Sequence, residues 1–173
     1  KSGVVTNITK PFDKGVSTTA ILLGKTKLYE FADNNKELKL RPSWHTHSGD
    51  VHLLKNFVSI NSALEVDLTG QVGAEELNGI PVSAIGGQPD LVRAAHRSDG
   101  GHAIIALPSS AKGGKFSRIV SKLSGPVTTA RSDVDVIVTE NGAADLRGKD
   151  LGQRRQALIS IAAPNFQEDL MKI

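Results

Sequence analysis

The strongest constraint on the fold is a set of short apolar segments that lack the alternation of a half-exposed strand. They are GIPVSAIGG at 79–87, HAIIALPSS at 102–110 and VDVIVTE at 134–140. Strands that are apolar throughout are buried on both faces, as in parallel sheets flanked by helices. The helix-like segment PDLVRAAHRS at 89–98 has proline in its first turn. We therefore expect an α/β layered sheet that is partly parallel, with flanking helices covering both faces.

Other segments complete this pattern. VSINSALEVDL at 58–68 alternates and predicts one further strand, with Val58, Ile60, Leu64, Val66 and Leu68 on one face and Asn61, Glu65 and Asp67 on the other. Near the C-terminus, Asp150 with Gln153 has capping-box spacing, and Asn165 with Glu168 repeats it. The chain has 173 residues, so we expect residues 1–173 to form one domain.

Composition narrows the possible functions. The chain has no cysteine, which excludes disulfides, thiolate zinc sites and a cysteine nucleophile and fits a reducing compartment. Aromatic residues make up only 4%, so the core must be aliphatic. The net charge of +3 comes from scattered basic residues without interleaved aromatics, which suits an anionic small molecule better than nucleic acid. The sequence shows neither a membrane-spanning run nor a signal-peptide pattern, so we expect a cytoplasmic protein.

Ligands of parallel sheets bind beyond the carboxyl ends of the strands, where three loops are expected to meet. The first loop is Gly86-Gly87-Gln88. Its glycines allow a ligand to approach the backbone closely, and the amides that enter the next helix can stabilise an oxyanion. The alternative is a tight strand-to-helix turn, which needs the same glycines. The loop at 108–114 contains Lys112 and suits either a phosphate or plain solvation, and it lacks Walker A spacing. The third loop is Glu140-Asn141-Gly142.

Carboxylates and histidines supply further candidates. Glu65 is either a nucleophile or base, or, as we favour, a hydrogen-bonded polar residue of a strand. For Glu140, burial would raise the pKa and suit proton transfer, whereas the alternative is a loop acceptor, and the residues alone leave both open. His45, His47 and His52 lack a fourth ligand at recognisable spacing, so a surface turn is favoured over a metal site.

Four longer motifs make the pattern specific. SINSALEVDLTGQV, IGGQPDLVRAA, IIALPSSAKGGKFSRIV and VIVTENGAADLRGK occur in this order. Together they closely resemble the C-terminal domain of the acetyl-CoA hydrolase/transferase family. This is a branch of the class I coenzyme A (CoA) transferases that includes 4-hydroxybutyrate CoA-transferases. The resemblance implies a NagB/RpiA-like α/β domain, one of two in a full enzyme that moves CoA between carboxylic acids through a glutamyl-CoA thioester.

The resemblance also implies roles for individual residues. The family's nucleophilic glutamate lies just upstream of the point matching Lys1, so this chain alone should be inactive. Gly87, with Gly86, matches the oxyanion-hole position, and Glu140 matches a glutamate that shapes the carboxylate pocket. Glu140-Asn141-Gly142 also resembles the active-site motif of the 3-oxoacid branch, which keeps a nucleophilic reading of Glu140 open.

The CoA-contacting positions implied by the resemblance are Leu64, Ser83, Gly87 and Lys112. Leu91 stands where the family often has phenylalanine, a departure in the acyl pocket that leaves the acyl group open. His47 falls near a position that is often asparagine in the family, so the resemblance assigns it no role. The implied ligands are acyl-CoA and a small carboxylate such as acetate, with no metal and no tightly bound cofactor. The implied protein partners are the missing N-terminal part of the enzyme and further copies in a homo-oligomer. The alternatives are a non-catalytic CoA- or nucleotide-binding module and an acyl-CoA hydrolase.

Overall fold

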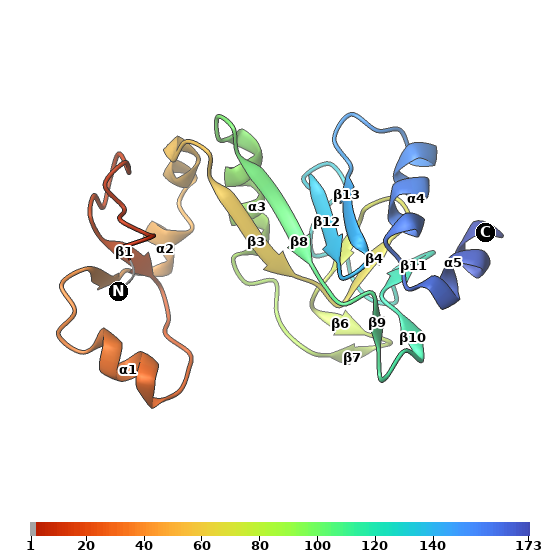
Figure 1. Cartoon of the computed structure of the whole chain (residues 1–173), viewed down its shortest axis with the longest axis horizontal. Helices are drawn as coiled ribbons and strands as arrows, with labels where there is room; N and C mark the ends of the chain where they lie inside the picture. Colours follow the sequence, from red (N-terminus) through yellow and green to blue (C-terminus); the bar gives the residue numbers. More distant parts are fainter. Residues whose placement is uncertain (1–2) are drawn as a thin grey trace.

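The main sheet has four strands in the order β13–β12–β8–β3 (Figure 1). The computed structural model describes residues 3–173, so the point matching Lys1 lies outside them. Three strands are parallel, and β13 runs antiparallel at one edge. The bounds are β3 (Val58–Ser62), β8 (His102–Ala106), β12 (Val136–Thr139) and β13 (Gly142–Asp145). The expected mixed α/β fold with a mostly parallel sheet is confirmed.

Helix α3 (Gln88–Arg97) packs on β3 and β8 and covers one face of this sheet. Side chains alternate along a strand, so Ala103, Ile105 and Ile137 share the covered face and are fully buried. The other face, which we call the open face, carries Val58, Ile60, Ile104, Val136 and Val138. Ile60 is 69% exposed, and the sheet lies in front of α3 in Figure 1 with no helix over its near face. Within residues 3–173, the expectation that helices cover both faces is therefore wrong.

Residues 58–68 form two strands and not one. The chain leaves β3 at Ser62 and enters β4 (Glu65–Asp67) in a second sheet, which has the order β11–β4–β5. Strand β4 pairs parallel with β11 (Ile119–Val120) and antiparallel with β5 (Val72–Gly73). Val66 is fully buried here whereas Ile60 is exposed, so the expectation of one strand with one apolar face is wrong. Alternation along the sequence cannot reveal that a strand changes sheet.

Two hairpins flank these sheets. They are formed by β6 (Glu76–Leu77) with β7 (Ile80–Pro81), and by β9 (Ser110–Ala111) with β10 (Phe116–Ser117). The strand expected at 79–87 is confirmed only for the two residues of β7. Beyond it, the amides of Val82 and Ser83 both donate to the Glu75 carbonyl, which takes the chain out of the ladder.

The N-terminal segment lies on the β3 side of the sheet (Figure 1). Its elements are β1 (Ser17–Thr19), α1 (Thr26–Ala32), β2 (Leu38–Leu40), α2 (Ser43–Thr46) and the 3-10 helix η1 (Gly49–Leu53). The strands β1 and β2 pair in parallel, and η1 packs against α3. The Asp13 carboxylate accepts bonds from His45 Nε2 at 2.6 Å and Arg41 Nη2 at 3.1 Å. The His45 bond is the main cause that lowers the pKa of Asp13.

The C-terminal helices are α4 (Leu151–Ser160), which packs against β13, and α5 (Pro164–Met171). The capping box is confirmed: the Gln153 amide donates to Asp150 Oδ1 at 2.8 Å, and the Asp150 amide donates to Gln153 Oε1 at 3.1 Å. The second expected box is wrong, because α5 is capped by Ala163 and Asn165 lies inside the helix. Proline fits the first helical position, where its missing N–H costs nothing.

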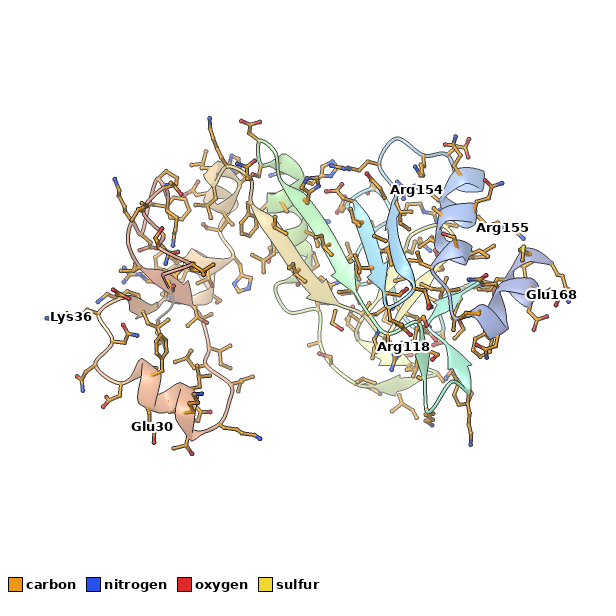
Figure 2. The ribbon with its side chains drawn as sticks, in the orientation of Figure 1. Glu30, Lys36, Arg118, Arg154, Arg155 and Glu168 are labelled. Carbon is orange, nitrogen blue, oxygen red and sulfur yellow. The ribbon has the colours of Figure 1, made fainter. Side chains whose placement is uncertain are left out.

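The buried core is aliphatic, as expected from the scarcity of aromatic residues. Valine, leucine, isoleucine and alanine side chains of both sheets and of helices α3, α4 and α5 make up its fully buried part. Arg155, labelled in Figure 2, donates from Nη2 to the Leu170 and Met171 carbonyls and so joins α4 to the end of α5. None of the helices found in residues 3–173 is long and apolar enough to cross a membrane.

Candidate functional site

The carboxyl ends of β3, β8 and β12 meet at one edge of the sheet, because these strands are parallel neighbours. We call this edge, with residues 63–64, 107–110 and 140–141, the rim. Across it, the Ser109 amide donates to Glu140 Oε2 at 2.8 Å, and the Ser109 hydroxyl donates to Oε1 at 2.6 Å. The carboxylate at the end of β12 therefore links two neighbouring loops, which confirms it as a loop acceptor.

The protonation of Glu140 follows from these bonds. The bond from the Ser109 hydroxyl, followed by that from the Ser109 amide, holds the pKa of Glu140 below its ordinary value. Glu140 is exposed, so burial opposes this effect only weakly. Of the two readings that the sequence left open for Glu140, a carboxyl whose pKa is raised by burial is therefore wrong. At neutral pH this residue is a fixed, ionised acceptor.

The rest of the β12–β13 turn is fastened to the connection between α4 and α5. The Asn141 side-chain amide donates to the Ala162 carbonyl at 3.2 Å, and the Thr139 hydroxyl donates to the Ile161 carbonyl at 2.7 Å. These bonds fix the position of Glu140 relative to the C-terminal helices.

The paired glycines form the turn that leads into α3. Gly86 has φ 58°, in the left-handed region that favours glycine, so the tight-turn reading is confirmed. Gly87 is the N-cap of α3, and the first amides of a helix have no acceptor within it. The buried Gln88 side chain donates to Thr129 Oγ1 at 3.1 Å and holds the helix start in place. The geometry thus leaves amides available for an anionic group.

The imidazole of His47 covers Gly87. A Cβ atom at position 87 would overlap Cδ2 and Nε2 of that ring, so any side chain there would force the imidazole to move. Nδ1 of His47 lies 2.9 Å from the Thr46 hydroxyl oxygen and 3.2 Å from the Ser43 carbonyl oxygen. The opposite edge of the ring therefore faces the turn. The structure brings His47 to the candidate site, which its position in the sequence did not indicate.

Two hollows adjoin at Leu64, which lines both. One, of about 340 Å³, is lined by Ser83, Gly86 and Gly87. The other, of about 560 Å³, is lined by Lys112, Phe116 and residues of β4 and β6. All four residues matched to CoA contacts thus line one of these two neighbouring hollows.

Arg118, labelled in Figure 2 beside the β9–β10 hairpin, fixes Leu64 where the hollows meet. Its Nη1 donates to the Leu64 carbonyl at 2.6 Å, and its backbone amide donates to the Ser109 carbonyl at 3.0 Å. Glu65, the next residue, accepts bonds from the amide and hydroxyl of Ser124, both at 2.9 Å. The hydrogen-bonded reading of Glu65 is therefore confirmed.

The histidines occupy separate positions. His45 is held by Asp13, and His47 lies over Gly87. In the part of the chain that the structure describes, no three histidine, aspartate or glutamate side chains are grouped to hold a metal ion.

Sequence reasoning missed two residues of this region. Ser109 contacts Glu140 across a separation of 31 residues, and no local pattern pairs them. Phe116 lines the larger hollow with Lys112. Its signal in the sequence was its place directly after a Gly- and Lys-rich loop, and the structure shows that it lies outside the core.

The chain is similar to known proteins over almost its whole length. Residues 24–173 match the profile of the acetyl-CoA hydrolase/transferase C-terminal domain. The 4-hydroxybutyrate coenzyme A transferase of Clostridium kluyveri is 45% identical over 180 residues, which cover 99% of this chain and 41% of that protein. The chain thus spans about two fifths of the length of such relatives.

Solved structures show the same fold. RipA from Yersinia pestis matches with a TM-score of 0.92 and 40% identity, over 98% of this chain and 39% of RipA. The 4-hydroxybutyrate CoA-transferase from Porphyromonas gingivalis matches with a TM-score of 0.82 and 38% identity, over 96% of this chain and 39% of that one.

Proposed function

Because the chain belongs to the acetyl-CoA hydrolase/transferase family, we propose that it is part of an acyl-CoA:carboxylate CoA-transferase. In this proposal the chain supplies the CoA-binding and oxyanion-hole elements. The nucleophilic glutamate comes from the part of the longer enzyme that this chain does not contain. The observation that carries the proposal is the pair of adjoining hollows, which leads from Lys112 past Leu64 to Gly87.

The proposed chemistry needs a donor to a developing negative charge. The glutamate carboxylate attacks the acyl-CoA thioester carbonyl, and the CoA thiolate leaves as a mixed anhydride forms. The thiolate then attacks the glutamyl carbonyl, which releases the first carboxylate and leaves a glutamyl-CoA thioester. A second carboxylate reverses the steps. At each attack the carbonyl oxygen becomes an oxyanion, which the Gly87 amide at the start of α3 would stabilise.

In this proposal the other candidate residues bind CoA or shape the carboxylate pocket. Leu64 and Ser83 would contact CoA along the hollows, and Lys112 would meet an anionic group of CoA with a flexible ammonium. Glu140 would shape the carboxylate pocket. Both of its carboxylate oxygens accept bonds from Ser109, and its lowered pKa leaves it a weaker base, which argues against a nucleophilic role.

The same proposal gives the open face an occupant. Strands that are apolar on both faces need cover on both, and the matched relatives are more than twice as long as this chain. We propose that the remaining part of the longer enzyme packs on the open face and completes a NagB/RpiA-like layered domain.

A charge placed on the open face tests this packing. Ile60→Lys should leave the chain of residues 1–173 unaffected, because Ile60 is 69% exposed, but it should lower the thermal stability of the longer enzyme. Ile80→Lys, at a side chain that is 67% exposed on β7, is the control and should be neutral in both. Equal behaviour of the two variants in the longer enzyme would contradict the packing.

Trapping and product analysis test the catalytic proposal. Borohydride added with acyl-CoA should inactivate the longer enzyme by reducing its glutamyl thioester, and no inactivation would overturn the covalent route. The family description also includes hydrolases, which supports acyl-CoA hydrolysis as the second candidate. Acetate separates the two: a transferase forms acetyl-CoA from butyryl-CoA only when acetate is present, whereas a hydrolase releases free CoA without it.

A further inference from the structure

Phe116 is an exposed aromatic side chain inside the larger hollow. It begins β10, and its side chain is 56% exposed although it stands beside the apolar residues Leu64, Leu77 and Val120. It lies outside the hydrophobic core, so its position is not explained by folding. A phenyl ring in such a hollow offers a flat apolar surface to a ligand.

A positive charge accompanies the ring. Lys112 Nζ lies 5.5 Å from the centroid of the Phe116 ring, within the range of a cation–π contact. Lys112, Gly113 and Gly114 all have positive φ, and the Lys115 amide donates to the Ala111 carbonyl at 3.0 Å. The loop therefore turns back tightly and keeps the ammonium group near the ring.

The β6–β7 hairpin contributes another wall of this hollow. Leu77 adds apolar surface and Asn78 adds amide donors and an acceptor. Glu65 also lines this hollow, and its Oε2 accepts two bonds from Ser124. An aromatic surface, an amide and a nearby cation together suit a flat heterocyclic base that carries phosphate groups.

We infer that Phe116 is the platform on which the adenine ring of CoA stacks, with Lys112 beside it for the phosphate groups. This inference rests on the proposed function and names the part of the substrate that the larger hollow takes. The pantetheine arm then passes Leu64, which lines both hollows, toward the turn at Gly87. Phe116 thus determines recognition of the nucleotide end and has no part in the acyl chemistry.

Calorimetric titration of the longer enzyme with two ligands tests this role. CoA carries adenine, and 4′-phosphopantetheine lacks the adenosine part. Phe116→Leu should raise the Kd for CoA about tenfold, because base–aromatic stacking has this order of effect. The same variant should leave the Kd for 4′-phosphopantetheine unchanged. Phe116→Tyr keeps the ring and should bind CoA as the unmodified enzyme does. Phe31→Leu, at an exposed ring of α1 outside this hollow, is the control and should change neither Kd.

The two proposals fail in different ways. A longer enzyme that binds neither ligand would overturn the proposed function and the stacking role with it. A longer enzyme that binds CoA, and whose affinity for CoA is the same after Phe116→Leu, would overturn only the stacking role. An equal loss of both ligands in that variant would also overturn it, because the damage would then not concern adenine.

Discussion

Alanine at position 87 probes the contact between the N-terminal segment and the start of α3. It adds one methyl group where the ring of His47 already lies. Gly87 has φ −91° and ψ 8°, a conformation open to alanine, so the backbone itself adds little strain. Any cost of Gly87→Ala must therefore come from the imidazole, which has to turn away.

The magnitude follows from that movement. Overpacking a well-packed contact costs about 1–3 kcal/mol. The clashing atoms of His47 belong to a half-buried side chain that can rotate, so we expect the lower end, about 1 kcal/mol. Rotation would also disturb the contacts of Nδ1 with Thr46 and Ser43.

A double-mutant cycle measures this contact directly. The free energy of unfolding in urea is compared for the chain of residues 1–173, Gly87→Ala, His47→Ala and the double variant. Gly87→Ala should cost about 1 kcal/mol beside histidine and almost nothing beside alanine, which gives a coupling energy of about 1 kcal/mol. If the two changes are additive, His47 does not lie over Gly87 and the reasoning is refuted.

Three further results are expected. Ser109→Ala should raise the pKa of Glu140 in an NMR titration and destabilise the chain at pH 7. Because Glu140 is exposed, this loss should stay below about 1 kcal/mol, and it disappears as pH falls through the lowered pKa of Glu140. Arg147→Leu should return the pKa of Asp145 from about 2 toward its ordinary 3.8. The side chains of Arg147 and Asp145 are both more than two fifths exposed, so the loss of unfolding free energy should stay below about 1 kcal/mol. Urea unfolding should show this loss above pH 3.8 and no loss below pH 2. Lys112→Ala should raise the KM of the longer enzyme for acyl-CoA without changing its preference among acyl chains, and an altered preference would contradict a phosphate-binding role.

The sequence predicted the features that depend on neighbouring residues. Helix α3, the capping box of α4 and the strands β8 and β12 are all encoded within windows of about ten residues. The rim could be placed in advance because parallel strands end at the same edge. The link between Ser109 and Glu140 could not, because it joins loops 31 residues apart. The direction of the pKa shift of Glu140 stayed open for the same reason, because its main cause is the hydroxyl of a distant residue and not burial.

The wrong expectation that helices cover both faces of the sheet has a physical explanation in the open face. The alternation at 58–68 correctly placed Val58 and Ile60 on one side of a strand, yet that side is exposed while the polar Ser59 is buried beneath α3. The buried Ser59 hydroxyl accepts a bond of 2.7 Å from the Asn61 side chain, so its burial leaves no unsatisfied oxygen. An arrangement in which β3 places its apolar residues outward and a satisfied polar pair inward is consistent with two covered faces, as the apolar strands predict. Ile60→Lys in the longer enzyme therefore tests whether strands that are apolar on both faces are covered on both. A loss of stability would mean that the rule holds once the rest of the enzyme is present, and no loss would mean that the rule fails for this sheet.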